Sequence, residues 1–550
     1  MGDQANFNSR LDSLRLDVNA LKEVRVHVPQ LYQGAVIGTK PHIIPNEQGK
    51  QGSLQVYASI ATNDGYIGPA EAQRGLAVFG HELRQDARTN PGKHPNIDLL
   101  EVIVETGDRL RTDIIRNYSA KSIPSSLHTA IPSIVKEFRT PFHVYNETGI
   151  RQTAKTLSQT FSWVPEVNGF GFRNYFAVKA LPNPRIVEIL KQEGMGADCS
   201  SFPELQIADA VGLRGEEIMF TSNDTPSAEF KFARDLGAVV NFDDLTHVDF
   251  FLRNVGDLPE LACFRYNPGE LKRGNSIIGN PTEAKYGLTR EQLSHGFRRL
   301  KDQGVKRFGL HTMVASNELN SDYFVETARI LFETVRDLSQ ELGINFEFIN
   351  LGGGIGTPYK PEQRTVDLSR VSEGTHEAYD ELISKNGLHP LRVVMENGRM
   401  ITGPHGFLVS RVLHVTKKHK DYVGLDACMT NLMRPALYGA HHEITVLGKE
   451  DAERTHIYDV TGSLCENNDK FAVNRPLPKV EEGDIVIIHN TGAHGYAMGF
   501  NYNGKLRSQE LLFREDRTTE RIRRAETSED YFRTLDFNGS RFSISAPGST

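Results

Sequence analysis

The clearest candidate for a reactive side chain in this 550-residue chain is a lysine that directly follows a short apolar run. Lys179 comes after Asn174–Val178, and Leu181–Pro184 then signals the start of a helix. A strand of this kind is buried on both faces, so an ammonium at its carboxyl end must be paired or neutral. A lysine that loses its proton easily can form a Schiff base with an aldehyde. Taken alone, Lys179 could also be a solvated lysine in a loop.

A glycine-rich loop follows a later apolar run. The stretch Asn350–Gly356 contains the three consecutive glycines Gly352, Gly353 and Gly354. Consecutive glycines let backbone N–H groups converge on an anion, because no Cβ stands in the way. We therefore interpret this loop as a candidate phosphate site, although a glycine-rich loop by itself is weak evidence.

The stretch Glu396–Arg399 follows the next apolar run. It supplies a carboxylate in Glu396, another glycine turn at Gly398 and a cation in Arg399. With Lys179 and the glycine loop, three strand ends thus offer an amine, an anion site and a carboxylate. Pyridoxal phosphate needs these three groups: a lysine for its aldehyde, a cradle for its phosphate and an acid for its ring nitrogen. The sequence therefore predicts pyridoxal 5'-phosphate as the cofactor.

The elements that would position these groups alternate regularly between residues 170 and 400. Eight short apolar strands are separated by helical patterns, which predicts a (β/α)8 barrel with all carboxyl strand ends on one face. The predicted strands are Asn174–Val178, Gly196–Cys199, Glu217–Thr221, Ala238–Asn241, Ala262–Tyr266, Phe308–Thr312, Phe346–Leu351 and Arg392–Met395.

The remainder of the chain predicts further domains. After Arg399, apolar runs separated by turn signals predict an antiparallel β domain. The first part predicts a small α/β module, with helices over Leu11–Val24 and Pro69–Asp86 and strands over Ala35–Ile44 and Ser53–Ala61. The predicted boundaries are 1–115 for the module, 116–140 for a Ser- and Pro-rich linker (Ser119–Ser133) and the first strand of the β domain, 141–400 for the barrel, 401–535 for the β domain and 536–550 for a disordered tail.

The composition argues against several functional classes. A net charge of -7 gives no sign of the excess of positive charge that binding to nucleic acid or an anionic membrane requires. No run approaches the length of about 18 apolar residues that a membrane span needs, and the first residues carry no secretory signal. Four cysteines without C-x-x-C spacing predict a reducing, cytoplasmic location and no structural zinc. His441 and His442 are adjacent, so on a strand they would point to opposite faces, and we expect no metal.

Seven motifs occur in the order typical of one enzyme family. They are Tyr175–Ala180, Gly196–Ser201, Gly352–Gly354, Glu396–Arg399, Arg434–Tyr438, Cys465–Asp469 and Gly492–Tyr496. Through them, the chain from about residue 140 to residue 512 resembles the fold-type III pyridoxal-phosphate decarboxylases, and within these the diaminopimelate decarboxylases. The resemblance implies an alanine-racemase-type barrel with a β domain. The first 115 residues are similar instead to a small uncharacterised bacterial family, which implies no chemistry.

The resemblance also implies roles at the cofactor. Lys179 would bind the cofactor aldehyde, and Glu396 would face the pyridine nitrogen. Gly398 and Arg399, together with the triple glycine, would hold the phosphate through backbone donors.

The substrate would be held by a second group of residues. Arg434 and Tyr438 would grip its distal carboxylate, with Arg399 beside them. Cys465 and Glu466 would come from the partner subunit of a homodimer, with Cys465 near the reacting carbon and Glu466 near the distal ammonium. A bidentate arginine–carboxylate pair is a strong and directional way to select a diacid.

The chain departs from the family pattern at three positions. Met313 stands where the family has a histidine that stacks on the cofactor ring. His494 replaces a tyrosine that touches the cofactor phosphate, and Asn397 replaces a proline. The resemblance places these three positions around the cofactor, whereas the substrate-binding residues Arg434 and Tyr438 follow the family pattern. We therefore expect the changes to affect the kinetics with diaminopimelate more than the binding of the cofactor.

These observations predict an amino-acid α-decarboxylase that converts meso-diaminopimelate to L-lysine and carbon dioxide. Three alternatives stay open: a decarboxylase of a related carboxylated amino acid, a racemase, and a non-catalytic homologue that regulates a partner. A racemase needs a second base opposite Lys179, for which the sequence offers no clear candidate. The intact Lys179, triple glycine and Cys465 argue against a non-catalytic role, whereas the extra N-terminal module keeps it open.

Overall fold

The computed structural model describes residues 11, 21–32, 35–47, 50–62, 66–116, 123–274 and 277–536. The chain divides into two compact units, residues 1–122 with 360–366, and residues 123–359 with 367–550. Across the ranges described, no helix is long and apolar enough to cross a membrane. The predicted disordered tail lies almost wholly outside the described residues.

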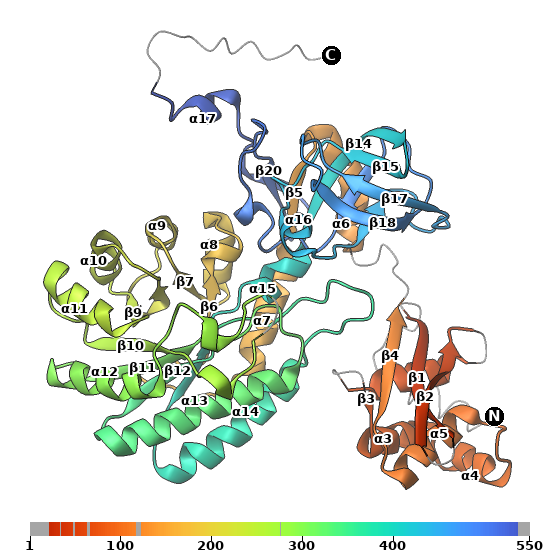
Figure 1. Cartoon of the computed structure of the whole chain (residues 1–550), viewed down its shortest axis with the longest axis horizontal. Helices are drawn as coiled ribbons and strands as arrows, with labels where there is room; N and C mark the ends of the chain where they lie inside the picture. Colours follow the sequence, from red (N-terminus) through yellow and green to blue (C-terminus); the bar gives the residue numbers. More distant parts are fainter. Residues whose placement is uncertain are drawn as a thin grey trace. The chain divides into compact units, whose positions relative to one another are not determined.

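The first unit is a small α/β module (Figure 1). Its antiparallel sheet has the strand order β2-β1-β4-β3, and its helices pack on the sheet around one apolar core. The Arg364 guanidinium, from the short second segment of this unit, donates to the carbonyl oxygens of Ala61 (3.1 Å) and Thr112 (3.4 Å). The elements are β1 Leu21–Tyr32, β2 Ala35–Pro45, α2 Gln51–Ile60, β3 Tyr66–Ile67, α3 Pro69–Phe79, α4 His81–Thr89, α5 Pro95–Thr106 and β4 Leu110–Arg116.

The predicted strand Ser53–Ala61 is wrong, because this segment forms helix α2. Its buried residues include Leu54, Tyr57 and Ala58, which recur at intervals of three and four residues. This spacing places them on one face of a helix, whereas a strand would need an interval of two. Burial against the sheet thus outweighs the local β propensity of the segment.

Two predicted helices of the module also differ from the structure. The helix predicted over Pro69–Asp86 is divided into α3 and α4 by Gly80, whose φ of 84° favours glycine and ends a helix. Of the helix predicted over Leu11–Val24, residues 12–20 lie outside the described residues, and residues 21–24 begin β1.

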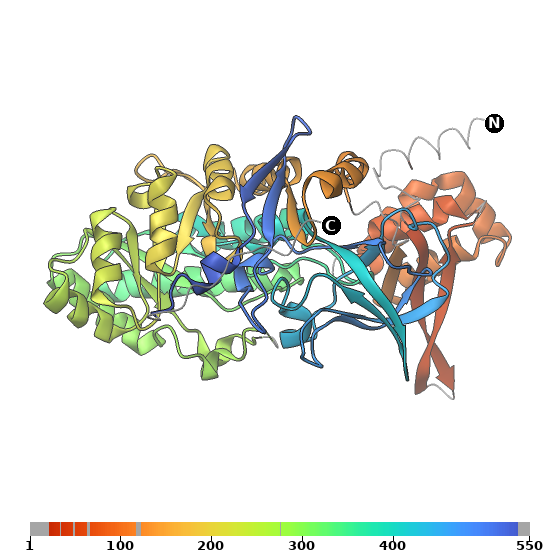
Figure 2. The same ribbon diagram turned by 90° about the horizontal axis from the view of Figure 1, so that it is seen from above.

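The second unit contains the predicted barrel, which is confirmed. Eight parallel strands close in the order β6-β7-β8-β9-β10-β11-β12-β13. In Figure 2 the helices of this barrel, coloured yellow to green, lie around its strands. The strands are β6 Arg173–Ala177, β7 Gly196–Cys199, β8 Ile218–Thr221, β9 Val239–Phe242, β10 Leu261–Tyr266, β11 Arg307–Thr312, β12 Phe346–Asn350 and β13 Arg392–Met395. The helices are α7 Glu147–Thr160, α8 Pro184–Gln192, α9 Phe202–Ala210, α10 Ser227–Asp235, α11 Leu245–Asn254, α12 Arg290–Asp302, α13 Ser321–Leu342 and α14 Leu368–Leu382.

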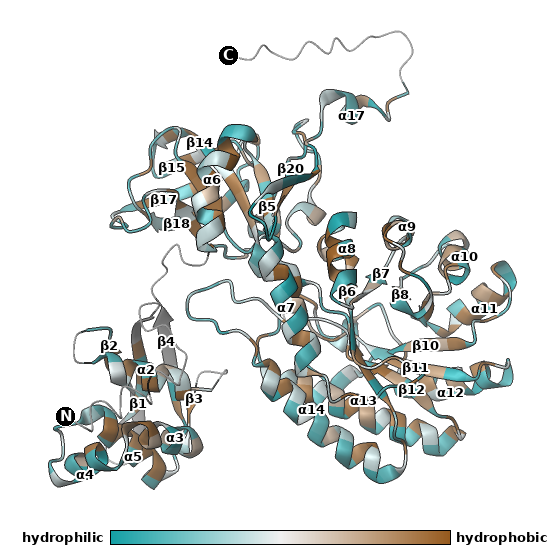
Figure 3. Cartoon of the chain, turned by 180° about the vertical axis from the view of Figure 1, so that it is seen from behind, coloured by the Kyte–Doolittle hydropathy of each residue, from teal (hydrophilic) through white to brown (hydrophobic). Residues whose placement is uncertain are grey.

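The barrel follows from the pattern of the chain. Its strands are almost wholly buried, as expected for a parallel sheet covered by helices. Figure 3 shows the contrast between these hydrophobic strands and the many hydrophilic residues on helices such as α13 and α14. Because all eight strands are parallel, their carboxyl ends meet at one face and bring distant motifs together.

The predicted β domain is confirmed, with a sheet that is mixed rather than purely antiparallel. β5 pairs with β20, and β15 with β17, in parallel; the other pairs are antiparallel. The strands are β5 Phe142–Asn146, β14 Gly406–Lys417, β15 Asp421–Leu425, β16 Ile444–Val446, β17 His456–Thr461, β18 Lys470–Leu477, β19 Ile485–Ile488, β20 Gln509–Phe513 and β21 Thr519–Arg523.

The Ser- and Pro-rich segment predicted as a linker is largely helical. Helix α6 covers Ser125–Glu137 and buries Leu127, Ile131 and Ile134 in the core of the β domain. These three residues lie four and three positions apart and form one apolar stripe. The first strand of the β domain, β5, begins at Phe142, after the 116–140 segment. The helical spacing of the apolar residues therefore outweighs the Ser and Pro content that had suggested a linker.

Candidate active site

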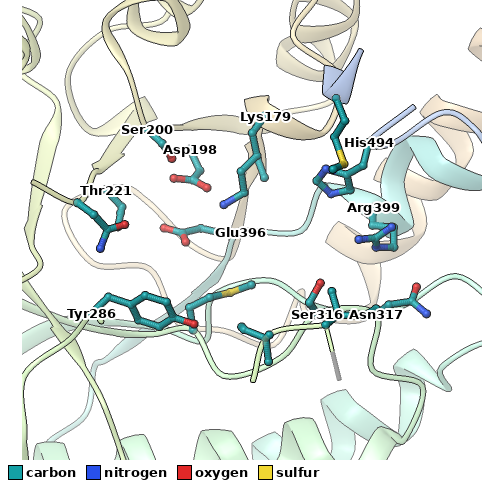
Figure 4. A pocket seen from close by; sticks show the side chains of 18 of the residues that line it. Lys179, Asp198, Ser200, Thr221, Tyr286, Ser316, Asn317, Glu396, Arg399 and His494 are labelled. Carbon is teal, nitrogen blue, oxygen red and sulfur yellow. The ribbon is translucent and has the colours of Figure 1, made fainter. Parts of the chain in front are cut away.

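A cavity of about 340 Å³ opens at the carboxyl ends of the barrel strands (Figure 4). Residues that follow the barrel strands form most of its wall, and residues of the β domain complete it. Among the residues predicted for the site, those that line the cavity are Lys179, Met313, Gly354, Glu396, Gly398, Arg399, Arg434, Tyr438 and His494. The structure thus brings most of the predicted site together.

Lys179 stands at the wall of this cavity. β6 ends at Ala177, and one 3-10 turn, Val178–Ala180, carries the chain away from the barrel core. Val178 and Ala180 are buried, whereas the Lys179 side chain points into the cavity toward Asp198 and Glu396 (Figure 4). An amine in this position can reach a ligand inside the cavity.

Glu396 is a buried carboxylate with fixed partners. His311 Nε2 lies 3.0 Å from one carboxylate oxygen, and Asn350 Nδ2 donates to the other over 2.7 Å. Burial by itself would raise the pKa of Glu396, but the charge and hydrogen bond of His311 and the amide of Asn350 hold that pKa below its ordinary value. Because an ionised carboxylate only accepts hydrogen bonds, His311 donates through Nε2. Glu396 is therefore an anion at neutral pH.

Asp198 is a second carboxyl group of the same cavity, and its pKa is shifted in the opposite direction. It is the last residue but one of β7 and is only 4% exposed. Burial and the negative charge of Glu396 hold the pKa of Asp198 well above its ordinary value. The surroundings therefore push the pKa values of the two carboxyl groups of the cavity in opposite directions.

The glycine loop requires glycine for conformational and steric reasons. Gly352 and Gly354 have φ values of 67° and 98°, which favour glycine. A Cβ on Gly353 would collide with the backbone of Glu396, and a Cβ on Gly398 would lie 2.7 Å from that of Ala180. Of the three glycines, Gly354 lines the cavity and presents bare backbone there. Gly352 and Gly353 are not among the lining residues, and their N–H groups donate to Asn350 Oδ1 over 2.9 Å and to the Met313 sulfur over 3.3 Å.

Of the three replaced residues, Met313 and His494 line the cavity, whereas Asn397 is buried and is not among the lining residues. The Met313 sulfur accepts a hydrogen bond from the Gly353 N–H over 3.3 Å, so this side chain also supports the glycine loop. His494 has a φ of 55°, and its N–H donates to the carbonyl oxygen of Ala180 over 2.9 Å. Burial and the charge of Arg399 hold the pKa of His494 well below its ordinary value. The His494 ring is therefore neutral at physiological pH.

Two arginines form the opposite part of the cavity. Arg399 begins helix α15 (Arg399–Thr402), and Arg434 begins helix α16 (Arg434–Tyr438). Arg434 is only 3% exposed, and burial lowers its pKa. Over the described part of the chain, no carboxylate lies within ion-pair distance of either guanidinium. Two cations with no protein counter-ion make this region a site for an anionic ligand group.

The remaining predicted residues lie at or outside the rim of the cavity. Tyr438 lines it and is 48% exposed. Cys465 and Glu466 lie in the turn between β17 and β18 and are not among the lining residues of this chain's own cavity. The Cys465 N–H donates to Asn503 Oδ1 over 2.9 Å, which fixes the exposed cysteine on the surface.

The structure adds four residues to which the sequence assigned no role in the site, although Asp198 lies within the motif Gly196–Ser201. Asp198 and Arg265 line the cavity, and both lie at or near the carboxyl end of a barrel strand. Their strand-end position is the signal that could have indicated them. Tyr359 and His442 lie behind the two arginines and come from separate loops, so no local pattern predicts their contacts.

This arrangement fits pyridoxal phosphate. Lys179 offers an amine inside the cavity, Gly354 presents backbone without a Cβ there, and Glu396 is a carboxylate of the kind that a protonated ring nitrogen needs as a partner. The three groups that the cofactor needs therefore meet in one cavity.

Comparisons with known sequences agree with this chemistry. A family model described as the pyridoxal binding domain of pyridoxal-dependent decarboxylases matches residues 153–403. Protein TabA of Pseudomonas amygdali pv. tabaci is 42% identical over 412 residues, which cover 75% of this chain and 95% of TabA. Diaminopimelate decarboxylase of Methanothermobacter thermautotrophicus is 31% identical over 404 residues, which cover 73% of this chain and 92% of that protein.

Two further matches concern the fold and the N-terminal module. The crystal structure of Helicobacter pylori diaminopimelate decarboxylase complexed with L-lysine matches with a TM-score of 0.66 and 27% identity, covering 73% of this chain and 98% of that one. Residues 18–114 match a family described as uncharacterized proteins conserved in bacteria. The chain therefore belongs to the pyridoxal-phosphate-dependent decarboxylases related to diaminopimelate decarboxylase, and its cofactor is pyridoxal 5'-phosphate.

Proposed function

We propose that this enzyme decarboxylates meso-diaminopimelate to L-lysine. The observation that carries the proposal is the pair Arg399 and Arg434, two cavity-lining cations without a protein counter-ion in the described residues. A distal carboxylate on the substrate would supply the missing anion, and Tyr438 would add a hydroxyl. The related Helicobacter pylori enzyme was crystallised with L-lysine, the product proposed here.

We assign separate roles in the reaction to the residues around the reacting carbon. The bound cofactor supplies an electron-withdrawing ring that stabilises the electron pair left when the α-carboxylate departs as carbon dioxide. Lys179 would hold the cofactor through its amine, and Glu396 would hold a proton at the ring nitrogen. A proton then replaces the lost carboxylate, so that one carbon dioxide leaves and one C–H bond forms. Cys465 or Lys179 would deliver this proton.

The proposed working unit is a homodimer with active sites at the interface. Cys465 and Glu466 lie outside this chain's own cavity. This placement supports the idea that they serve the cavity of the partner, Cys465 at the reacting carbon and Glu466 at the distal ammonium. All four cysteines of the chain are free, which supports a reducing, cytoplasmic location.

A related amino acid with a distal carboxylate is a second candidate substrate. Two observations favour it: Met313 and His494 alter the cofactor side of the cavity, and TabA is more similar to this chain than the diaminopimelate decarboxylases reported above. The arginine pair would serve either substrate in the same way.

Product analysis tests the proposal. The purified enzyme with its cofactor is incubated with meso-diaminopimelate, and carbon dioxide and L-lysine are quantified together with the stereoisomers of the remaining substrate. We expect equal amounts of carbon dioxide and L-lysine. Interconversion of stereoisomers without carbon dioxide would indicate a racemase, and no reaction with any amino acid of a panel would indicate a non-catalytic homologue.

A further inference from the structure

Tyr359 contacts both arginines of the cavity from behind. The Arg434 guanidinium lies over the face of the Tyr359 ring, 4.3 Å from its centroid. Arg399 Nη1 donates to the Tyr359 hydroxyl over 3.1 Å. One side chain thus uses its π face for the first guanidinium and its hydroxyl oxygen for the second.

His442 holds Arg434 from another direction. Arg434 Nη1 lies 2.9 Å from His442 Nε2, and His442 Nδ1 lies 2.7 Å from the carbonyl oxygen of His489. A guanidinium can only donate and a carbonyl can only accept, so Nε2 is the acceptor and Nδ1 carries the hydrogen. The His442 ring is therefore neutral and held in one tautomer, and it is fully buried.

Both residues belong to a supporting layer behind the cavity wall. Tyr359 is 5% exposed, His442 is 0% exposed, and neither is among the residues that line the cavity. Their rings also meet edge to face, with centroids 5.0 Å apart. The loop of Tyr359 is tied to the β domain, because Asn490 Nδ2 donates to the carbonyl oxygen of Pro358 over 3.3 Å. The two arginines are thus supported by one connected set of side chains.

The side chains that support the two arginines carry no charge, and this affects how strongly the arginines attract an anionic ligand. Two guanidinium groups that line one cavity repel each other, and a glutamate or aspartate behind them would remove the repulsion. Such a carboxylate would also neutralise the charge that a ligand has to meet. A tyrosine face, a hydroxyl oxygen and an imidazole nitrogen orient the guanidinium groups and leave their charge for the ligand.

We propose that Tyr359 and His442 are positioning residues that hold Arg399 and Arg434 without neutralising them, and so set the preference for a ligand with a distal carboxylate. This inference rests on the proposed function, because it concerns the same substrate end. It adds two specificity-determining residues that would touch neither substrate nor cofactor.

A matched pair of ligands tests the inference. L-lysine and cadaverine (1,5-diaminopentane) share the same chain and terminal amines and differ only in the carboxylate. Dissociation constants for both are measured by titrating the full-length enzyme with its cofactor, by calorimetry and by visible absorption. In the unchanged enzyme we expect L-lysine to bind about ten to a few hundred times more tightly than cadaverine.

Four variants distinguish positioning from a general structural role. Tyr359→Leu removes the ring face and the hydroxyl, and His442→Phe removes the acceptor but keeps a buried ring. Both should reduce the lysine-to-cadaverine preference at least about tenfold, with cadaverine binding unchanged within about twofold. Tyr359→Phe keeps the ring face, so it should lose less of the lysine-to-cadaverine preference than Tyr359→Leu. His442→Gln offers a hydrogen-bond acceptor, so it should keep more of that preference than His442→Phe.

The outcomes separate failure of the inference from failure of the proposed function. If the unchanged enzyme binds L-lysine and cadaverine equally, the proposed substrate is wrong. If the unchanged enzyme discriminates but the Tyr359 and His442 variants keep the full preference, or weaken both ligands equally, the positioning role is overturned. Where Tyr359→Leu or His442→Phe fails to fold, Tyr359→Phe and His442→Gln decide by the same ratio.

Discussion

At Glu396 and Asp198, the pKa values of two carboxyl groups of one cavity are pushed apart by their surroundings. Hydrogen bonds from His311 and Asn350 lower the pKa of Glu396, and burial next to that carboxylate raises the pKa of Asp198. Groups whose pKa values are pushed apart by their surroundings are typical of catalytic sites. The difference follows from residues that are neighbours in space, which the motif Gly196–Ser201 by itself does not show.

Replacing Asp198 by Asn tests this pKa shift through stability. Between its unfolded and folded pKa values, a carboxyl group whose pKa rises on folding binds more protons in the folded protein, so it destabilises the fold increasingly as the pH rises from its ordinary value of 3.8 toward the folded value. Asp198→Asn removes this penalty. We expect the Tm of the variant to exceed that of the unchanged enzyme at about pH 8 and the difference to vanish toward pH 3.8.

Thermal unfolding over this pH range provides the measurement, and the exposed Asp302→Asn variant on α12 is the control. A Tm difference that does not depend on pH would show that folding does not raise the pKa of Asp198.

Lys179 carries the most direct residue-scale prediction. Among the described residues that line the cavity, Lys179 is the one lysine, and its amine points toward Glu396, so Lys179→Ala should lose both turnover and the visible absorption of the bound cofactor. Absorption spectra and carbon dioxide release check both effects. Lys155→Ala, at a half-exposed position on α7, is the control and should behave as the unchanged enzyme. Normal activity of Lys179→Ala would contradict the cofactor assignment.

At the scale of elements, the barrel could be predicted almost residue by residue. Short apolar runs with turn signals fixed the eight strands to within one or two residues at each end. Prediction failed where tertiary burial decides, as in α2 and in α6, whose Ser- and Pro-rich sequence conceals one apolar stripe. The contacts of Tyr359 and His442 could not be predicted, because they join loops that are far apart in sequence.

Helix α6 should contribute stability and no chemistry. Leu127 is fully buried in the core that α6 shares with strands of the β domain, so Leu127→Ala should lower the free energy of unfolding by about 2–5 kcal/mol. The midpoint of urea denaturation measures this effect, with the exposed Ser133→Ala as control. We expect the folded variant to keep its kcat/KM. An unchanged midpoint would show that α6 does not pack as described.

At the scale of the whole molecule, assembly should complete the active site. If Cys465 serves the cavity of the partner, Lys179→Ala and Cys465→Ala subunits are each inactive, but a mixed dimer contains one intact site. Equal mixing should therefore restore about one quarter of the normal activity, since half of the dimers are mixed and each has one working site of two. Activity after subunit exchange, with exchange shown by native mass spectrometry, checks the prediction. Exchange without any recovery would place both residues in sites built within one chain.

Substrate preference tests the whole proposal most directly. Hydrogen bonds to charged groups contribute roughly 1.5–3 kcal/mol each, so the distal carboxylate should be worth about tenfold to a few hundredfold in kcat/KM. We expect meso-diaminopimelate, or a similar amino acid with a distal carboxylate, to be preferred by this factor over ornithine, lysine and arginine. Arg434→Ala should erase most of the preference while the visible absorption of the cofactor remains. The measurement is kcat/KM for carbon dioxide release across these amino acids, and turnover of lysine or ornithine as efficient as that of any carboxylated substrate would contradict it.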